Sequence, residues 1–105
     1  MFAAVSHLPH LLAFALVHNL AQRENRDLLL SFAASGFRDF TRIAASSPEM
    51  WRDISLANRD ALLIEMGRYM QELEALHKAL AAADGAKLEE IFSIARTVRS
   101  NWTPP

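Results

Sequence analysis

Two histidines near the start of this 105-residue sequence have a spacing that could serve chemistry. His7 and His10 are three residues apart, so on a helix they share roughly one face. Zinc-binding helices more often space their histidines four apart with a glutamate between them, and no third ligand is evident nearby. We therefore expect no metal site. A histidine beside Pro9 in an apolar helix instead indicates a buried hydrogen-bonding group or a ligand contact.

A second group combines two arginines with an aspartate. Arg38 and Arg42 are one helical turn apart, and Asp39 can pair with Arg42 three residues further on. A solvated charge cluster is the interpretation that these residues favour when taken alone. The alternative is a guanidinium fork aimed at a carboxylate, with the aspartate orienting it. Gly36 precedes the cluster and would let a ligand approach the backbone, which supports the second interpretation.

Other candidates carry less chemistry. Trp51 is expected in the core, although it could also wall a pocket for a six-membered ring. Glu89 and Glu90 are adjacent and diverge on a helix, so they suit the helix dipole better than acid–base work. The sequence has no Gly-x-Gly-x-x-Gly motif, phosphate loop or nucleophile–base arrangement, so we expect no catalytic residue in this chain.

Charge and composition exclude several classes of protein. Eleven basic residues face twelve acidic ones, which argues against general binding to nucleic acid or to anionic membranes. The absence of cysteine excludes disulfides and thiolate metal sites. The longest uninterrupted apolar run near the start is 11–17, whereas a spanning helix needs about 20 residues. With no basic residue before that run, a signal peptide does not fit either, so we expect a cytoplasmic protein without a membrane segment.

The elements that must position these residues are predicted to be helices. Ala, Leu, Glu and Arg are abundant and no strand-like alternation occurs, so an all-α fold of about five to six helices is expected. The first should cover residues 3–22, with Pro9 kinking it or delaying its start. A second should run from near Asn25 to a C-cap at Gly36. The predicted remainder is a short helix over 37–45, one opened by Ser47-Pro48, a long amphipathic one over 58–82, and a last one after Asp84-Gly85 that buries an apolar face through Trp102.

The first predicted helix has a consequence for assembly. It is apolar on almost every side, and such a helix must be covered on every side. Short or one-sided helices in a small chain are unsuited to cover it completely. We therefore predict a homodimer with this helix near the two-fold axis.

Three stretches in a fixed order make the sequence resemble a known family. They are Ala4-Val5-Ser6-His7-Leu8-Pro9-His10, Gly36-Phe37-Arg38-Asp39-Phe40-Thr41-Arg42-Ile43-Ala44, and Ser47-Pro48-Glu49-Met50-Trp51-Arg52-Asp53-Ile54 with Asn58 after it. All three are similar to the second, helical domain of prephenate and arogenate dehydrogenases. The resemblance implies that residues 1–105 form one interlocked helical dimerisation domain of the 6-phosphogluconate dehydrogenase C-terminal type. It also implies a preceding Rossmann domain, absent here, that binds NAD or NADP.

The resemblance further implies an activity for the whole enzyme and roles for particular residues. Prephenate, or arogenate, is oxidised at its ring hydroxyl carbon with loss of carbon dioxide; prephenate gives 4-hydroxyphenylpyruvate for tyrosine biosynthesis. Arg42 would bind a substrate carboxylate, and the remaining pocket residues would be Ser6, His10 and Trp51, with Gly36 and Asp39 nearby. Both subunits of the homodimer can contribute to such a pocket. The histidine that engages the reacting hydroxyl belongs to the absent half, so this chain alone should be inactive.

Two other functions remain open. All-helical chorismate mutases are also small intertwined dimers that bind dicarboxylates with arginines. They would need several basic residues along the first helix, and here none precedes Arg23. The other alternative is a helical dimerisation module that has no ligand of its own.

Overall fold

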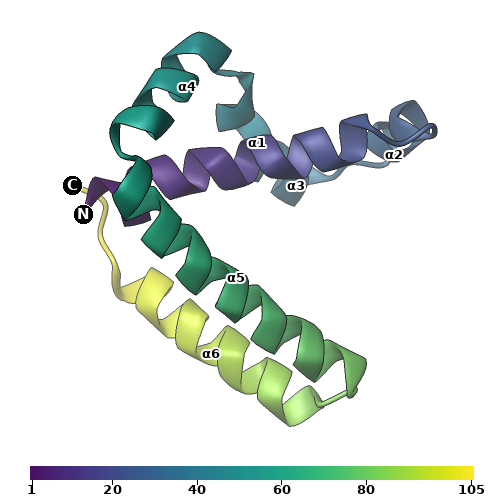
Figure 1. The fold of residues 1–105 in the computed structure, drawn as a ribbon. Helices are drawn as coiled ribbons and strands as arrows, with labels where there is room; N and C mark the ends of the chain where they lie inside the picture. Colours follow the sequence, from purple (N-terminus) through teal and green to yellow (C-terminus); the bar gives the residue numbers. More distant parts are fainter. The chain divides into compact units, whose positions relative to one another are not determined.

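The computed structural model describes residues 1–105 and contains only helices, which confirms the predicted all-α class (Figure 1). In chain order the elements are η1 (Ala3–His7), α1 (Leu8–Ala21), α2 (Arg26–Ser31), α3 (Ser35–Thr41), η2 (Arg42–Ala45), α4 (Pro48–Ala57), α5 (Arg59–Ala81) and α6 (Gly85–Asn101). The chain divides into two compact units, Met1–Met66 and Gly67–Pro105, and the division falls inside α5.

Pro9 shapes the start of the first unit as predicted, by delaying the α-helix. Residues 3–7 form a π-helical turn, in which the Leu8 amide donates to the carbonyl of Ala3 five residues earlier. The α-helix proper then begins at Leu8, with Pro9 in its first turn. A proline ring clashes with the carbonyl four residues before it, so a wider turn immediately upstream relieves the clash with Val5. Helical geometry therefore continues without a break from Ala3 to Ala21.

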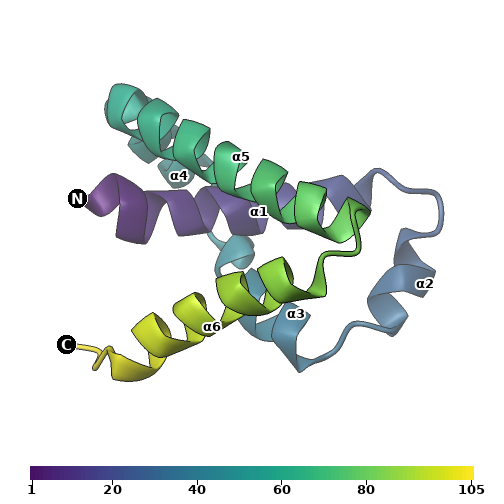
Figure 2. The same cartoon turned by 90° about the horizontal axis from the view of Figure 1, so that it is seen from below.

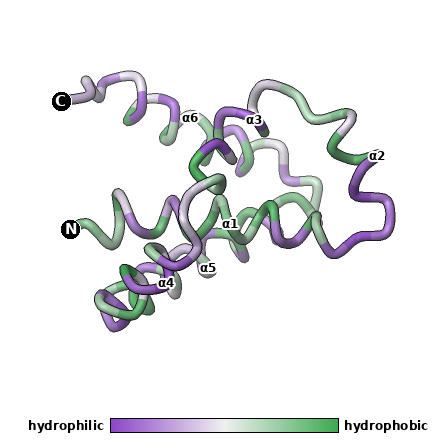
Figure 3. Tube along the Cα trace, turned by 90° about the horizontal axis from the view of Figure 1, so that it is seen from above, coloured by the Kyte–Doolittle hydropathy of each residue, from purple (hydrophilic) through white to green (hydrophobic).

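The helix formed by η1 and α1 is apolar around its circumference, and its trace is coloured as hydrophobic along most of α1 (Figure 3). Leu8 and Ala13 are buried, whereas Leu16 and Val5 are exposed in this single chain. One expectation needs correction here. Because the helix passes through Pro9 unbroken, Ala3–Ala21 is 19 residues long and, by length and composition alone, sufficient to cross a membrane. The short apolar run within it is therefore no argument against a span.

The segment between α1 and α4 corrects a second expectation. Helix α2 ends at Ser31, and Gly36 is not its C-cap but the second residue of α3. Gly36 has no positive φ, and Ala34 supplies the extended residue at which the chain turns. Figure 2 shows α3 returning alongside α1, and both α3 and η2 pack against α1. The predicted short helix over 37–45 is present, as α3 tightening into a 3₁₀ turn at η2.

Helix α4 begins as the sequence predicts. The Ser47 hydroxyl accepts a hydrogen bond from the Met50 amide at 3.2 Å, and Pro48 occupies the first helical position. The helix ends at Asn58, whose amide donates to the carbonyl of Ile54. This short element places Trp51 in its first turn.

The second unit pairs the later part of α5 with α6, which confirms the two predicted helices. Ala83 adopts φ 52°, and the Asp84 amide donates to the Ala79 carbonyl at 2.9 Å, which closes a Schellman motif. Asp84 then caps α6 by accepting from the Lys87 amide. The predicted burial of the α6 face is wrong for the single chain, because Phe92, Val98 and Trp102 are exposed. Their apolar surface has nothing to cover it within this unit.

Candidate functional site

The closest aromatic contact of the first unit joins the first helix to α4. The imidazole of His10 lies flat on the indole of Trp51, with ring centroids 3.9 Å apart and an interplanar angle of 16°. Trp51 is 9% exposed and is the only large aromatic side chain in the buried set. His10 is half-buried. The stack therefore lies at the border of a small core.

The hydrogen bonding of His10 fixes where its proton lies. Its Nδ1 is 2.9 Å from the backbone carbonyl of Ser6, one turn earlier on the helix. A carbonyl oxygen only accepts, so Nδ1 carries the proton and donates. In the neutral ring Nε2 is then an acceptor, and in the charged ring it becomes a second donor. Nε2 is thus left available to a ligand, and Ser6 acts here through its backbone.

The indole of Trp51 is held from a second side and keeps one unused polar atom. The ring of His7 approaches it edge-on, with centroids 6.0 Å apart and an interplanar angle of 79°. The Trp51 Nε1 atom is buried and has no hydrogen-bond partner in the chain. An unpaired buried N–H costs about 1–3 kcal/mol. A ligand or a second subunit that offers an acceptor would recover that cost.

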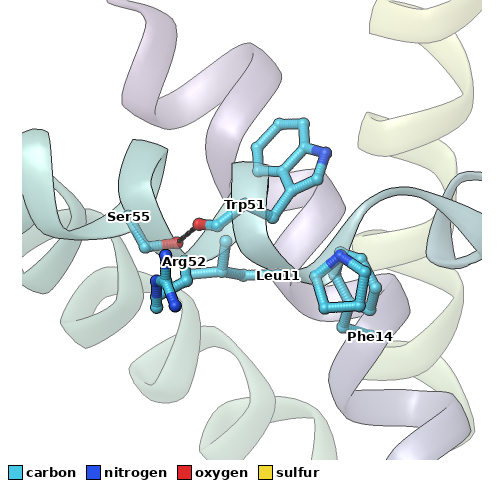
Figure 4. A pocket seen from close by; sticks show the side chains of 6 residues that line it. Leu11, Phe14, Trp51, Arg52 and Ser55 are labelled. Atoms are coloured by element: carbon cyan, nitrogen blue, oxygen red, sulfur yellow. Dashed lines mark hydrogen bonds between the residues drawn. The ribbon is translucent and has the colours of Figure 1, made fainter.

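A shallow apolar pocket of about 250 Å³ lies beside Trp51. Figure 4 shows the side chains that surround it, which come from two helices: Leu11 and Phe14 from α1, and Trp51, Arg52 and Ser55 from α4. The Ser55 hydroxyl donates to the Trp51 carbonyl, so its proton is already used in a hydrogen bond within α4. The pocket wall is chiefly carbon, which suits a ring better than a charged group.

The second predicted cluster lines a different cavity, of about 530 Å³, which includes Arg38, Asp39 and Arg42. The expected pair between Asp39 and Arg42 is wrong, because no ion pair joins them and both side chains are exposed. Asp39 lies in α3 and Arg42 at the start of η2, and both side chains point into solvent, where an ion pair gains little. Gly36 lies on α3 with open space around its Cα. The Arg42 guanidinium is therefore free to meet an anion.

The structure thus brings together three of the six predicted site residues, namely Ser6, His10 and Trp51. Asp39 and Arg42 share the other cavity, and Gly36 borders neither pocket. Asn58 was noted after the third resembling stretch but given no role in the site; its side-chain amide donates to His7 Nδ1 at 3.1 Å across 51 residues of chain. No local spacing signals a contact of that length.

Comparisons with known proteins show which family this chain belongs to. Residues 1–94 match the family described as the prephenate dehydrogenase dimerization domain. The chain belongs to this family. A prephenate dehydrogenase of Bacillus subtilis is 41% identical over 98 residues, which is 92% of this chain and 26% of that protein. A cyclohexadienyl dehydrogenase of Zymomonas mobilis is 37% identical over 101 residues, or 94% of this chain and 34% of that protein.

A solved structure extends the match to three dimensions. The arogenate dehydrogenase of Synechocystis superposes with a TM-score of 0.89 at 27% identity, over 97% of this chain and 38% of that one. The all-helical fold is therefore that of this dehydrogenase family. The chain spans about a quarter to a third of the curated relatives that it matches. Nothing in the family match supports the chorismate mutase alternative.

Proposed function

We propose that this chain is the dimerisation and substrate-binding part of a dehydrogenase that oxidises prephenate, or arogenate, with loss of carbon dioxide. For prephenate the product is 4-hydroxyphenylpyruvate, in tyrosine biosynthesis. The chain would hold the substrate, and hydride transfer would take place against a nicotinamide bound elsewhere. The single observation that carries this assignment is the His10–Trp51 stack, in which each ring keeps one polar atom without a partner in the chain. In a chain of a dehydrogenase family, such atoms are suited to bind the substrate.

Arg42 supports the substrate class. Prephenate carries two carboxylates, and a guanidinium is the side chain that binds a carboxylate with two parallel hydrogen bonds. Arg42 has no acidic partner in the chain and lines an open cavity. Its charge is therefore available for a substrate carboxylate, with Asp39 and Gly36 close by in sequence.

The His10–Trp51 stack supports the second half of the recognition. His10 Nε2 can accept from a hydroxyl in the neutral ring or donate to a carboxylate in the charged ring. The Trp51 N–H donates only, so it requires an oxygen acceptor. Trp51 also lines the pocket walled by Leu11 and Phe14, which would accommodate the carbon face of the substrate ring. These groups bind and orient the substrate, and proximity is their contribution to the rate.

The nicotinamide cofactor does not fit the residues of this chain. Dinucleotides bind where a strand meets a glycine-rich turn at a helix start, and residues 1–105 contain no strand and three separate glycines. NAD or NADP would supply the hydride acceptor from a further domain of the protein. Since the relatives are three to four times as long as the stretch they share with this chain, they have room for such a domain.

Trp51 and Arg42 line two cavities that have no residue in common, so one chain does not bring them into a single pocket. A homodimer in which one pocket takes residues from both subunits would bring them together.

Apolar residues of α6 also require a partner. Phe92, Ile94 and Val98 are each more than half exposed in the single chain. A second copy would cover them, and it would also cover the apolar helix Ala3–Ala21 that could otherwise span a membrane. With this helix covered by protein, the whole enzyme would be a cytoplasmic biosynthetic enzyme, as the names of its relatives suggest.

The test is an assay of the whole dehydrogenase that carries this chain. Reduction of NAD or NADP is followed by absorbance with prephenate, arogenate or chorismate as substrate. We expect reduction with prephenate or arogenate, none with chorismate, and none from residues 1–105 alone. Conversion of chorismate to prephenate by the isolated chain would favour the mutase instead. A whole protein that reduces neither cofactor with either substrate would leave only a dimerisation module.

A further inference from the structure

His7 contacts both Asn58 and Trp51, and the proposed substrate contacts give it no role. Its Nδ1 accepts from the Asn58 side-chain amide at 3.1 Å, and its ring edge contacts the indole of Trp51. Both hydrogen-bonding side chains are partly buried. The contact links η1 to the residue that ends α4, so it joins two segments that are far apart in sequence.

The two histidines of the segment require opposite tautomers. An amide nitrogen donates, so Nδ1 of His7 must be unprotonated and its proton lies on Nε2. In His10 the carbonyl partner demands the proton on Nδ1. Each imidazole contacts Trp51, and each is fixed by a different partner outside the rings. A packing role alone would not distinguish Nδ1 from Nε2 in this way.

The geometry of α4 shows what the His7–Asn58 bond controls. Asn58 follows Trp51 by about two helical turns on the same side of α4. Trp51 is held on the first helix by the His10 stack, and Asn58 is held there by His7. Rotation of α4 about its axis is therefore opposed at two points. Loss of the Asn58 bond would leave the direction of the Trp51 N–H dependent on ring contacts alone.

We propose that His7 and Asn58 form a positioning pair that sets the rotation of α4 and thereby the orientation of Trp51 against His10. Neither residue needs to touch the substrate. The consequence for substrate affinity rests on the function proposed above, whereas the effect on Trp51 itself does not. The pair acts through the acceptor at Nδ1, and this atom gives the proposal a specific test.

Three variants separate the bond from the bulk of the side chain. In His7→Asn the amide oxygen falls at the position of Nδ1 and can accept from Asn58. In His7→Gln the amide falls at the position of Nε2 and cannot. Asn58→Ala removes the donor. All are made with Trp102→Phe, so that Trp51 alone fluoresces; Trp102 lies in the second unit and contacts Arg99.

In residues 1–105 we expect His7→Gln and Asn58→Ala to shift the Trp51 emission to the red. In the whole dehydrogenase the same changes should raise KM for prephenate about three- to tenfold, the value of one hydrogen bond, with little change in kcat. His7→Asn should keep both the emission and KM of the parent. Equal behaviour of His7→Asn and His7→Gln, whether both normal or both impaired, would overturn the proposal.

A second measurement needs no variant and no substrate. Long-range ¹H–¹⁵N spectra of the unaltered chain report which nitrogen of each histidine is protonated. We expect protonated Nε2 in His7 and protonated Nδ1 in His10. The same tautomer in both rings would contradict the positioning pair even if the dehydrogenase turns over prephenate normally. Conversely, the expected tautomers together with absent turnover would count against the proposed function alone.

Discussion

The imidazole of His10 stacks on the indole of Trp51 with ring centroids 3.9 Å apart, and this contact fixes α4 to the first helix of the unit. It joins the one large buried aromatic side chain to a histidine whose Nδ1 is already committed to the Ser6 carbonyl. Core packing and the presentation of two polar ring atoms therefore depend on the same pair. Stability and ligand affinity should respond differently to changes at Trp51.

Trp51→Ala should destabilise the chain by about 3–5 kcal/mol, because it empties the largest site of the small core and removes the partner of His10. Trp51→Phe should cost less, since a phenyl ring keeps the stack and removes an unpaired buried N–H. Chemical denaturation followed by circular dichroism measures both. The matched control is Trp102→Ala, which removes a half-exposed indole and its cation–π contact with Arg99 and should cost about 0.5–1 kcal/mol. Equal losses at the two tryptophans would contradict the assignment of Trp51 to the core.

Ala83→Gly should stabilise the chain. Ala83 has φ 52°, a left-handed conformation that is costly for a side chain with a Cβ and free of that cost for glycine. After the greater flexibility of glycine in the unfolded chain is subtracted, a gain of about 0.5–1 kcal/mol is expected. Ala81→Gly, inside the last turn of α5, is the control and should lose about the same amount. Urea denaturation measures the free energy of unfolding of both variants. A lower free energy of unfolding for Ala83→Gly would show that the φ of Ala83 is not left-handed in solution.

Ile94→Glu should dissociate the proposed homodimer. Ile94 is 60% exposed and lines a groove of about 460 Å³ between α5 and α6, where a second copy would bury it. An unpaired buried carboxylate costs several kcal/mol, so the dimer dissociation constant should rise about a hundredfold or more. Gln71→Glu adds the same charge outside the groove and should leave the dimer intact. Sedimentation at micromolar concentration is the measurement, and a stable monomer for the unaltered chain would end the dimer proposal.

Local rules were enough to predict the helices and several of their ends. Ser47 and Pro48 gave the start of α4, because capping and a missing N–H act within one turn. Gly36 was assigned to the wrong end of a helix, since Ala34, a residue with no special signature, makes the turn that glycine was expected to make. The apolar face of α6 was expected to be buried within the chain, but it is exposed. Apolar periodicity shows that a face needs covering, but not whether the same chain or a second one covers it.

The candidate site was predictable only in part, for a related reason. The sequence resemblance singled out His10, Trp51 and Arg42, but it gave no tautomer and no contact between them. The stack of His10 on Trp51 and the bond from Asn58 to His7 depend on how α4 settles against the first helix. The expected pair of Asp39 with Arg42 is absent because spacing shows only that two side chains can meet, and two exposed charges gain little by meeting in water.

The substrate role of this chain depends most directly on Arg42. In the whole dehydrogenase, Arg42→Ala should raise the dissociation constant for prephenate about 10- to 100-fold, since a charge-assisted bond to a carboxylate is lost. Arg38→Ala is the matched control, because it removes an exposed guanidinium from the same cavity and should change affinity less than about twofold. Calorimetric titration of the two variants with prephenate is the decisive measurement. A large loss confined to Arg42 is the predicted result, and unchanged affinity in Arg42→Ala, or an equal loss in both variants, would contradict it.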